Sequence, residues 1–201
     1  FSSMSPKSRF TSFDVTCMVH DLQSKVVGQR LTNIYDLSEK VYLLKFAIPE
    51  SARESCDATN KVNVLMESGV RFHSTNYDRE KSDMPSPFTM KLRKHLRSKR
   101  LEGITQLGTD RIIDLRFGSG DAASHLIVEF YSNGNVVLTD GKYSVLGLLR
   151  GHQFDEDVVL KVGEPYPIRY TTKSVVGLGD SGSSISAEGS NVEEQQQQQQ
   201  Q

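Results

Sequence analysis

The sequence lacks the features that would place it in a membrane or in an oxidising compartment. It has two cysteines, Cys17 and Cys56, and no apolar run near the roughly 18 residues that span a bilayer. We expect Cys17 on the apolar face of a helix and Cys56 in a polar loop, so a disulfide is not expected. No signal peptide is visible. These absences favour a soluble cytoplasmic protein with no membrane partner.

Signatures of catalytic chemistry are missing as well. The five histidines are scattered, and neither cysteine has a CxxC partner or a histidine at ligand spacing, so we expect no metal. The glycine-rich residues 117–120 join two expected strands, whereas a phosphate-binding loop joins a strand to a helix. No nucleophile elbow is present. The sequence therefore predicts a protein that is not an enzyme and has no cofactor.

Composition divides the chain into one folded domain and two flanking segments. Residues 171–201 hold almost no large apolar side chains, are rich in serine and glycine, and end in seven glutamines. Such a segment cannot offset its chain entropy by burial, so we expect disorder. Residues 1–6 are expected to be disordered or foreign to the native start, because Met4 is a plausible initiator. The folded domain is expected over residues 7–170.

Hydrophobic periodicity predicts two helices. The first covers residues 11–28, where Thr11 and Asp14 have the spacing of a capping box. The second is expected to begin near Pro87, to bury one apolar face, and to end at Gly103.

Short apolar runs between turn signals predict eight strands. They cover residues 41–48, 62–67, 70–73, 104–107, 111–117, 125–131, 135–140 and 144–150. Two helices with about eight strands define an α+β fold, which we expect to be a β-sandwich-like sheet domain with flanking helices.

Positive charge is concentrated in and after the second expected helix. The whole chain has a formal net charge of -1, yet residues 91–101 contain no aspartate or glutamate. An ordinary surface helix interleaves acids with its cations, and uncompensated cations repel one another unless phosphate neutralises them. The pattern favours a phosphate-binding surface over the alternative, a merely solvated face. The six cations are Lys91, Arg93, Lys94, Arg97, Lys99 and Arg100.

Five motifs, in this order along the chain, resemble the NFACT-N domain of the nuclear export mediator factor family, and its fungal members most closely. They are residues 7–14 (KSRFTSFD), 28–36 (GQRLTNIYD), 91–96 (KLRKHL), 110–111 (DR) and 129–136 (EFYSNGNV). The resemblance extends over residues 7–170, the whole of the expected domain.

The resemblance implies a role on the ribosome. Family members bind large ribosomal subunits that still carry a stalled nascent chain. They hold transfer RNAs, of the alanine and threonine types in fungi, so that the stalled chain is extended without messenger RNA. They also help to recruit a Listerin-type ubiquitin ligase, which the resemblance assigns to regions beyond this chain. Because the ribosome supplies peptidyl transfer, such a protein is a binding factor.

The resemblance also implies particular site residues. Tailing in the family requires an acidic residue near the N-terminus and an Asp-Arg pair, which match Asp14, Asp110 and Arg111; Arg9 of the first motif joins them as a transfer-RNA contact. An arginine can pair with phosphate or stack on a base, and carboxylates can accept from base amino groups. Taken alone, Asp14 has a structural explanation as a capping residue, and Asp110 as a turn residue. If the start of the first helix and the start of the strand at residue 111 meet in the fold, we expect their polar side chains to form one cluster beside the six cations.

A remoter resemblance, to the N-terminal domain of formamidopyrimidine-DNA glycosylases, leaves an enzyme alternative. Those enzymes use an amino-terminal proline, directly after the initiator, as their nucleophile. Here Pro6 is one place late and its nitrogen lies in an amide, which argues against that chemistry. A structural adaptor that binds only protein is the other alternative, and it predicts no salt-sensitive RNA affinity.

Overall fold

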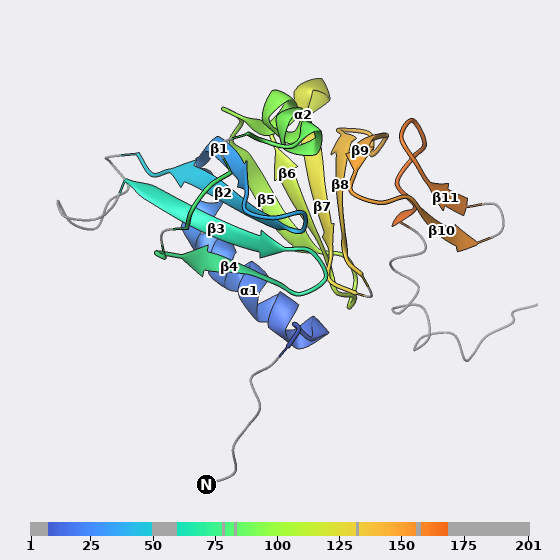
Figure 1. Ribbon diagram of the computed structural model, residues 1–201, viewed down its shortest axis with the longest axis horizontal. Helices are drawn as coiled ribbons and strands as arrows, with labels where there is room; N and C mark the ends of the chain where they lie inside the picture. Colours follow the sequence, from blue (N-terminus) through green and yellow to red (C-terminus); the bar gives the residue numbers. More distant parts are fainter. Residues whose placement is uncertain are drawn as a thin grey trace, which may run out of the picture.

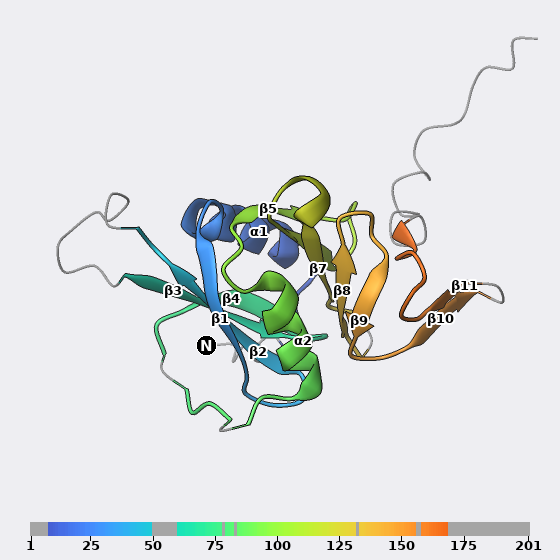
Figure 2. The ribbon, with the colours of Figure 1, turned by 90° about the horizontal axis from the view of Figure 1, so that it is seen from above.

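Two antiparallel sheets face each other in the computed structural model, and two helices flank them (Figures 1 and 2). The structure describes residues 8–49, 60–77, 79–82, 84–131, 133–155 and 158–168. One sheet has the order β1-β2-β3-β4, the other β5-β6-β7-β8-β9, and β10 pairs with β11. The predicted α+β sandwich with flanking helices is confirmed. The predictions of disorder at 1–6 and 171–201, and Cys56, lie outside the described residues.

The elements have these bounds: α1 Ser12–Val26, β1 Arg30–Asp36, β2 Val41–Ala47, β3 Lys61–Glu67, β4 Arg71–Thr75, α2 Pro87–Leu96, β5 Leu101–Gln106, β6 Ile112–Phe117, β7 Ser124–Glu129, β8 Asn135–Asp140, β9 Val145–Leu148, β10 His152–Asp155 and β11 Val158–Leu160. Within the described residues, no helix is long and apolar enough to cross a bilayer.

Helix α1 begins at a complete capping box. The Asp14 amide donates to Thr11 Oγ1 (3.2 Å), and the Asp14 carboxylate accepts from the Thr11 amide (2.7 Å). Four aliphatic side chains at helical spacing, from Val15 to Val26, are buried and hold the helix against the edges of both sheets, β4 and β5. Cys17 is exposed, so its expected place on the apolar face is wrong.

Helix α2 is shorter than the sequence predicts. Ser86 caps its first turn, and the Ser86 amide in turn donates to Asp36 Oδ2 (2.8 Å). The helix ends at Leu96 because Ser98 takes a left-handed conformation (φ +68°) and its amide donates to Leu31 O (2.7 Å). The chain after α2 therefore pairs with the start of β1, and Arg97, Lys99 and Arg100 lie beyond the helix.

The main hydrophobic core fills the space between the two sheets, with both helices contributing to it. Aromatic rings from opposite sheets stack across it: Phe72 on Phe130 at 5.0 Å and Phe46 on Phe117 at 6.4 Å between ring centroids. The sheets also meet at one end, where Gly69 N donates to Glu129 O (3.2 Å). Gly134 is required there, because a Cβ on it would lie 2.1 Å from Gly69 N.

A second, smaller core lies on the outer face of the five-stranded sheet. Ile112, Ile127 and Val137 pack there against Leu160 and Tyr166 from the last described part of the chain. The C-terminal segment thus covers one end of this face, beside the ends of β6 and β7 that lie near residues 111 and 129.

Candidate nucleic-acid interface

The start of α1 meets the turn that precedes β6. Ser12 Oγ donates to the carbonyl oxygen of Thr109, across 97 residues of sequence. The Gln106 amide group links the same two places, because its Nε2 donates to Ser12 O (3.2 Å) and to Asp110 O (2.7 Å). These contacts bring Asp14 near the Asp110-Arg111 pair. We call Ser12, Asp14, Gln106, Asp110 and Arg111 the helix-start cluster.

The two members of the Asp-Arg pair are partly buried and rigidly placed at the backbone. Asp110 Oδ1 accepts from the Arg111 amide (2.7 Å), and Arg111 O accepts from the Phe130 amide (2.8 Å). Strand β6 begins only at Ile112, one residue later than predicted. Both the amide and the carbonyl of Arg111 are therefore hydrogen-bonded, which fixes the position of its Cα and so of the base of its side chain.

A buried carboxyl group lies behind this pair. Glu129 is 2% exposed, and Glu129 Oε1 accepts from Tyr166 Oη (2.9 Å). Burial raises the pKa of the Glu129 carboxyl, and the negative charge of Asp110 adds to the rise. The same two causes, burial and nearby carboxylates, raise the pKa of the Tyr166 phenol. The negative charge of Asp110 therefore acts on the two buried groups next to the helix-start cluster, the Glu129 carboxyl and the Tyr166 phenol.

Asp14 and Arg9 are the two other residues predicted to contact transfer RNA. The Asp14 carboxylate accepts from the amide and the hydroxyl of Thr11, both at 2.7 Å, so its capping role is fully realised. Arg9 is exposed and precedes the first residue of α1 by three positions. Their predicted roles in binding transfer RNA stay predictions.

Sequence reasoning missed one residue of this surface. Phe13, between Ser12 and Asp14, is 75% exposed, whereas the apolar residues of α1 at positions 15, 19, 22 and 26 are buried. The available signal was its phase, because residue 13 falls off the buried stripe of the helix. A large aromatic ring facing solvent next to an Asp-Arg pair has the chemistry of a base-stacking platform.

Four of the six predicted phosphate-binding cations also donate hydrogen bonds within the protein. Arg93 Nε donates to Ile34 O (2.7 Å) and its guanidinium lies over the Tyr35 ring, 5.5 Å from the centroid. Arg97 Nε donates to Thr32 O (3.2 Å), also on β1. These contacts tether α2 and the segment after it to the edge of the four-stranded sheet.

Two lysines of the set, Lys91 and Lys99, reach the other sheet and the turn before β7. Lys91 Nζ donates to Leu146 O on β9 (2.8 Å), and Lys99 Nζ donates to Ala122 O (2.5 Å) and Ser124 Oγ (3.0 Å). Four of the six cations therefore donate hydrogen bonds within the protein, although Lys91 and Arg97 are still exposed.

Lys94 and Arg100 are the free cations of the set. Both are exposed, and neither side chain has a hydrogen bond to the part of the chain that the structure describes. None of the six cations is ion-paired with a described acid, so the surface stays positive. The field is felt by His95, whose pKa is lowered by burial and then by the charges of Lys94, Lys99 and Lys91.

We call the surface formed by the six cations from Lys91 to Arg100 the basic surface. The helix-start cluster and the basic surface lie at opposite ends of β5. The strand Leu101–Gln106 begins one residue after Arg100 and ends before the turn that carries Asp110. Six residues of strand span about 20 Å. Figure 1 shows α2 at the top of the molecule and the start of α1 at the bottom. The start of α1 and the turn before β6 do meet, which was the condition of the prediction, but the predicted place of the cluster, beside the basic surface, is wrong.

The fold matches solved structures of two N-terminal domains. The N-terminal domain of the fibronectin-binding protein PavA from Streptococcus pneumoniae has a TM-score of 0.64 at 24% identity, covering 78% of this chain and 63% of that one. The N-terminal part of the fibronectin/fibrinogen-binding protein from Streptococcus suis has a TM-score of 0.66, also at 24% identity, covering 78% of this chain and 60% of that one. These likenesses define the class of fold.

Sequence comparison gives the family. Residues 11–169 match the model of the NFACT N-terminal and middle domains, and the chain belongs to this family. A Drosophila melanogaster protein named ribosome quality control complex subunit NEMF homolog is 46% identical over 162 residues. The ribosome quality control complex subunit 2 of Schizosaccharomyces pombe is 42% identical over 166 residues. The match to a Methanocaldococcus jannaschii protein named archaeal Rqc2 homolog aRqcH is 30% over 147 residues.

The chain is much shorter than these relatives. The alignments cover 81% of this chain but 16% of the Drosophila protein, and 80% of this chain but 15% of the Schizosaccharomyces protein. The predicted membership of the NFACT-N family, close to its fungal subunits, is confirmed. The remoter likeness to glycosylases stays a prediction.

Proposed function

We propose that this chain is the nucleic-acid-binding domain of a ribosome-associated quality control factor. The names of its relatives support such a role, and the match to a family model over most of the chain supports a shared mode of action. In this proposal the domain binds transfer RNA on the large ribosomal subunit and works in the cytoplasm. It carries out no bond-making step of its own.

The observation that carries the proposal is the junction between Ser12 and Thr109. It brings an acidic residue of α1 together with the Asp-Arg pair, although 95 residues separate Asp14 from Thr109 in the sequence. An arginine with a planar fork, carboxylates and an exposed ring are the groups that recognise unpaired bases in RNA. We assign transfer-RNA recognition to Asp14, Asp110, Arg111 and Arg9, with Phe13 as a stacking surface.

The basic surface has a different part in the proposal. Lys94 and Arg100 face solvent in a positive field, which suits sequence-independent contact with phosphates. We assign this surface to RNA backbone, at a distance from the helix-start cluster that an extended RNA can span. The extension of stalled chains by alanine and threonine, and recruitment of a Listerin-type ubiquitin ligase, belong to the full-length protein.

The test replaces Asp14, Asp110 and Arg111 by alanine in the full-length protein. We expect alanine and threonine tailing to be abolished, while the variant still folds and still sediments with stalled large subunits. The matched control replaces Asp21, Glu67 and Arg71, which are also two acids and one arginine and which make surface ion pairs elsewhere. Intact tailing in the folded triple variant would rule out the site, and equal loss in the control would reduce it to a charge effect.

A further inference from the structure

Two glutamine side chains connect α1 to β5, and only one of them reaches the Asp-Arg pair. Within the strand, Gln23 Nε2 donates to Ile104 O (2.8 Å). At the last residue of the strand, Gln106 bonds in two directions, to α1 on one side and to the turn after β5 on the other. The first glutamine is a link in the body of the domain, whereas the second contacts the backbone that carries the residues we assign to transfer RNA.

Gln106 uses both ends of its side-chain amide. Its Oε1 accepts from Thr16 Oγ1 (2.6 Å), and its Nε2 donates to Ser12 O (3.2 Å), Ser12 Oγ (3.1 Å) and Asp110 O (2.7 Å). Carbonyl oxygens only accept hydrogen bonds, so the reverse orientation of the amide would leave Oε1 facing two acceptors. The surroundings therefore determine the orientation of this amide, and Thr16 holds it from the side of α1.

The turn between β5 and β6 is held by two sets of hydrogen bonds. Its own backbone closes the hairpin, because the Leu107 amide donates to Ile112 O (3.0 Å) and the Asp110 amide donates to Leu107 O (3.3 Å). Bonds to Thr109 O and Asp110 O then tie the tip of the hairpin to the start of α1. The first set fixes the internal shape of the turn, and the second set fixes its position relative to Asp14.

We propose that Gln106 is a positioning residue for transfer-RNA binding, which acts through the Asp-Arg pair by holding its turn in place beside Asp14. The inference rests on the proposed function of the helix-start cluster. A site binds more tightly when its groups are already arranged as in the complex, because binding then orders fewer of them. Loss of the Gln106 side chain leaves the backbone pairing of β5 with β6 in place. We therefore expect weaker binding with little loss of stability.

The test measures the affinity for transfer RNA and the melting temperature of the whole chain in two matched variants. Gln106→Met keeps the length of the side chain and removes both of its hydrogen-bonding ends. Gln23→Met makes the same change at the other link between α1 and β5. We expect Gln106→Met to weaken binding by about fivefold and Gln23→Met to change it by less than about twofold. The two melting temperatures should differ by less than about 5 °C.

A double-mutant cycle with Arg111→Ala separates positioning of the Asp-Arg pair from a general structural effect. If Gln106 acts through this pair, Gln106→Met should weaken binding by less than about twofold once residue 111 is alanine. The same loss in both backgrounds would mean that Gln106 acts independently of Arg111, and it would overturn the inference. Equal losses of affinity in Gln106→Met and Gln23→Met would overturn it as well.

Thr16→Val is a second variant, which keeps the test decisive where Gln106→Met does not fold. Thr16 is exposed, and valine has the same shape but lacks the hydroxyl that donates to Gln106 Oε1. We expect a loss of about twofold to threefold, which also disappears when Arg111 is alanine. Unchanged affinity in both variants, with Arg111→Ala weakened, would overturn this inference alone. The proposed function itself is contradicted when the unsubstituted chain does not bind transfer RNA or Arg111→Ala binds it equally well.

Discussion

The two ends of strand β5 show how differently charged residues can be used in one domain. Near its start, six cations crowd together, and four of them donate hydrogen bonds to oxygen atoms of neighbouring elements. Near its end, contacts through Ser12, Gln106 and Thr109 bring the start of α1, which carries Asp14, to the turn that carries Asp110 and Arg111. At the first end four of the six cations also hold neighbouring elements together, whereas at the other end the fold brings together the residues that we propose as the transfer-RNA site.

A high density of charged residues in a sequence therefore does not show which of them bind a ligand and which hold two elements of the protein together. A long cation such as Arg93 can hold a helix on a sheet edge and still add to the surrounding positive field. A small group such as Asp110 and Arg111 becomes conspicuous only when the fold brings a second element to it. The predictions below test whether the two ends have separate functions.

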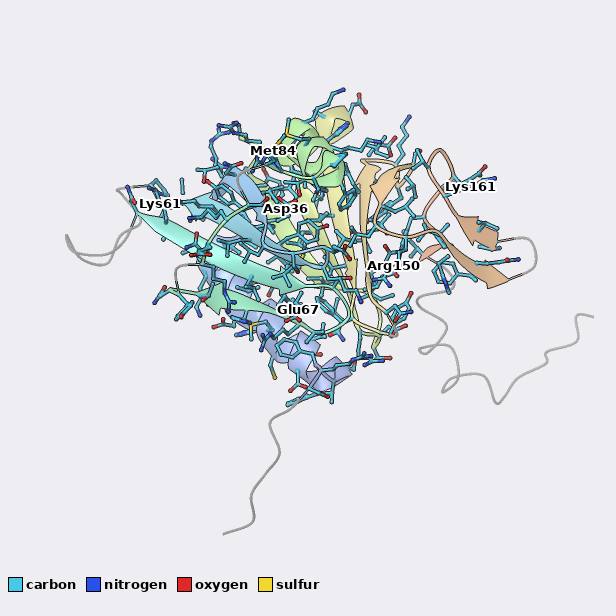
Figure 3. All side chains as sticks on the ribbon, in the orientation of Figure 1. Asp36, Lys61, Glu67, Met84, Arg150 and Lys161 are labelled. Carbon is cyan, nitrogen blue, oxygen red and sulfur yellow. The ribbon has the colours of Figure 1, made fainter. Side chains whose placement is uncertain are left out.

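The largest effect is expected for Arg111→Ala. Losing one charge-assisted contact should weaken transfer-RNA binding by about tenfold or more, with little change in melting temperature because the backbone bonds of Arg111 remain. Filter binding and thermal unfolding of the same preparation measure both. Arg71→Ala is the control, since Arg71 pairs with Glu67 at the β3–β4 turn, where Figure 3 labels Glu67. A similar loss of affinity in the control would contradict a specific role for Arg111.

The next largest effect is a difference in stability between two substitutions on α2. Arg93 holds the helix to β1, whereas Lys94 makes no such bond, so Arg93→Ala should destabilise the protein more than Lys94→Ala. Arg93→Ala removes the bond to Ile34 O and the contact with Tyr35, which we expect to lower the free energy of unfolding by about 1–2 kcal/mol. Lys94→Ala should change it by less than about 0.5 kcal/mol. Urea unfolding of both variants measures this difference. Equal free energies of unfolding would show that the contacts of Arg93 with β1 do not stabilise the fold.

A smaller effect is expected on the salt dependence of RNA binding. Lys94→Gln and Arg100→Gln should each lower the log-log salt slope by about 1, with little dependence on RNA sequence. Binding isotherms between low and moderate salt give the slope. An unchanged slope in both variants would make this surface only a solvated face, and no salt-sensitive affinity at all would favour a protein-binding adaptor.

The smallest effect is on the pH dependence of stability. Because burial raises the pKa of Glu129 above its ordinary 4.5, the folded state holds a proton that the unfolded state has lost in that window. Stability should therefore fall as pH rises from about 4.5 through the folded pKa, and Glu129→Gln should flatten this fall. Asp110→Asn should narrow the window, since the charge of Asp110 adds to the rise. Melting curves from pH 4 to 8 that are parallel in all three proteins would contradict this.

The sequence predicted the elements with strong local signals. The capping box of α1 and the sandwich class are confirmed. The sequence left open whether the start of α1 meets the turn before β6, and the structure shows that it does. The second helix was extended too far, because its end is set by pairing of Ser98 with Leu31 and no local signal marks it. Strand β1 was missed, since a bulge between Leu31 and Asn33 breaks its alternation. Strands β10 and β11 are too short for a pattern.

The candidate site was predictable only in part. Family motifs supplied Asp14, Asp110 and Arg111, and the helical phase of Phe13 could have shown its exposure, but Gln106 has no local signature. The anchoring of the cations was also hidden, because their partners are main-chain carbonyls, which every sequence contains. The main-chain partners of these cations are 23 to 65 residues away in sequence, so only tertiary packing determines them.

The measurement that tests the central claim most directly uses fluorescence at the two ends of β5. The chain contains no tryptophan, so Phe13→Trp places a single reporter in the helix-start region and Met90→Trp places one on α2. Both positions are exposed, at 75% and 53%. We predict that transfer RNA quenches the Phe13→Trp variant saturably, as stacked bases do, and the Met90→Trp variant far less. Transfer RNA that binds with unchanged affinity, leaves the Phe13→Trp emission untouched and quenches Met90→Trp would contradict the account.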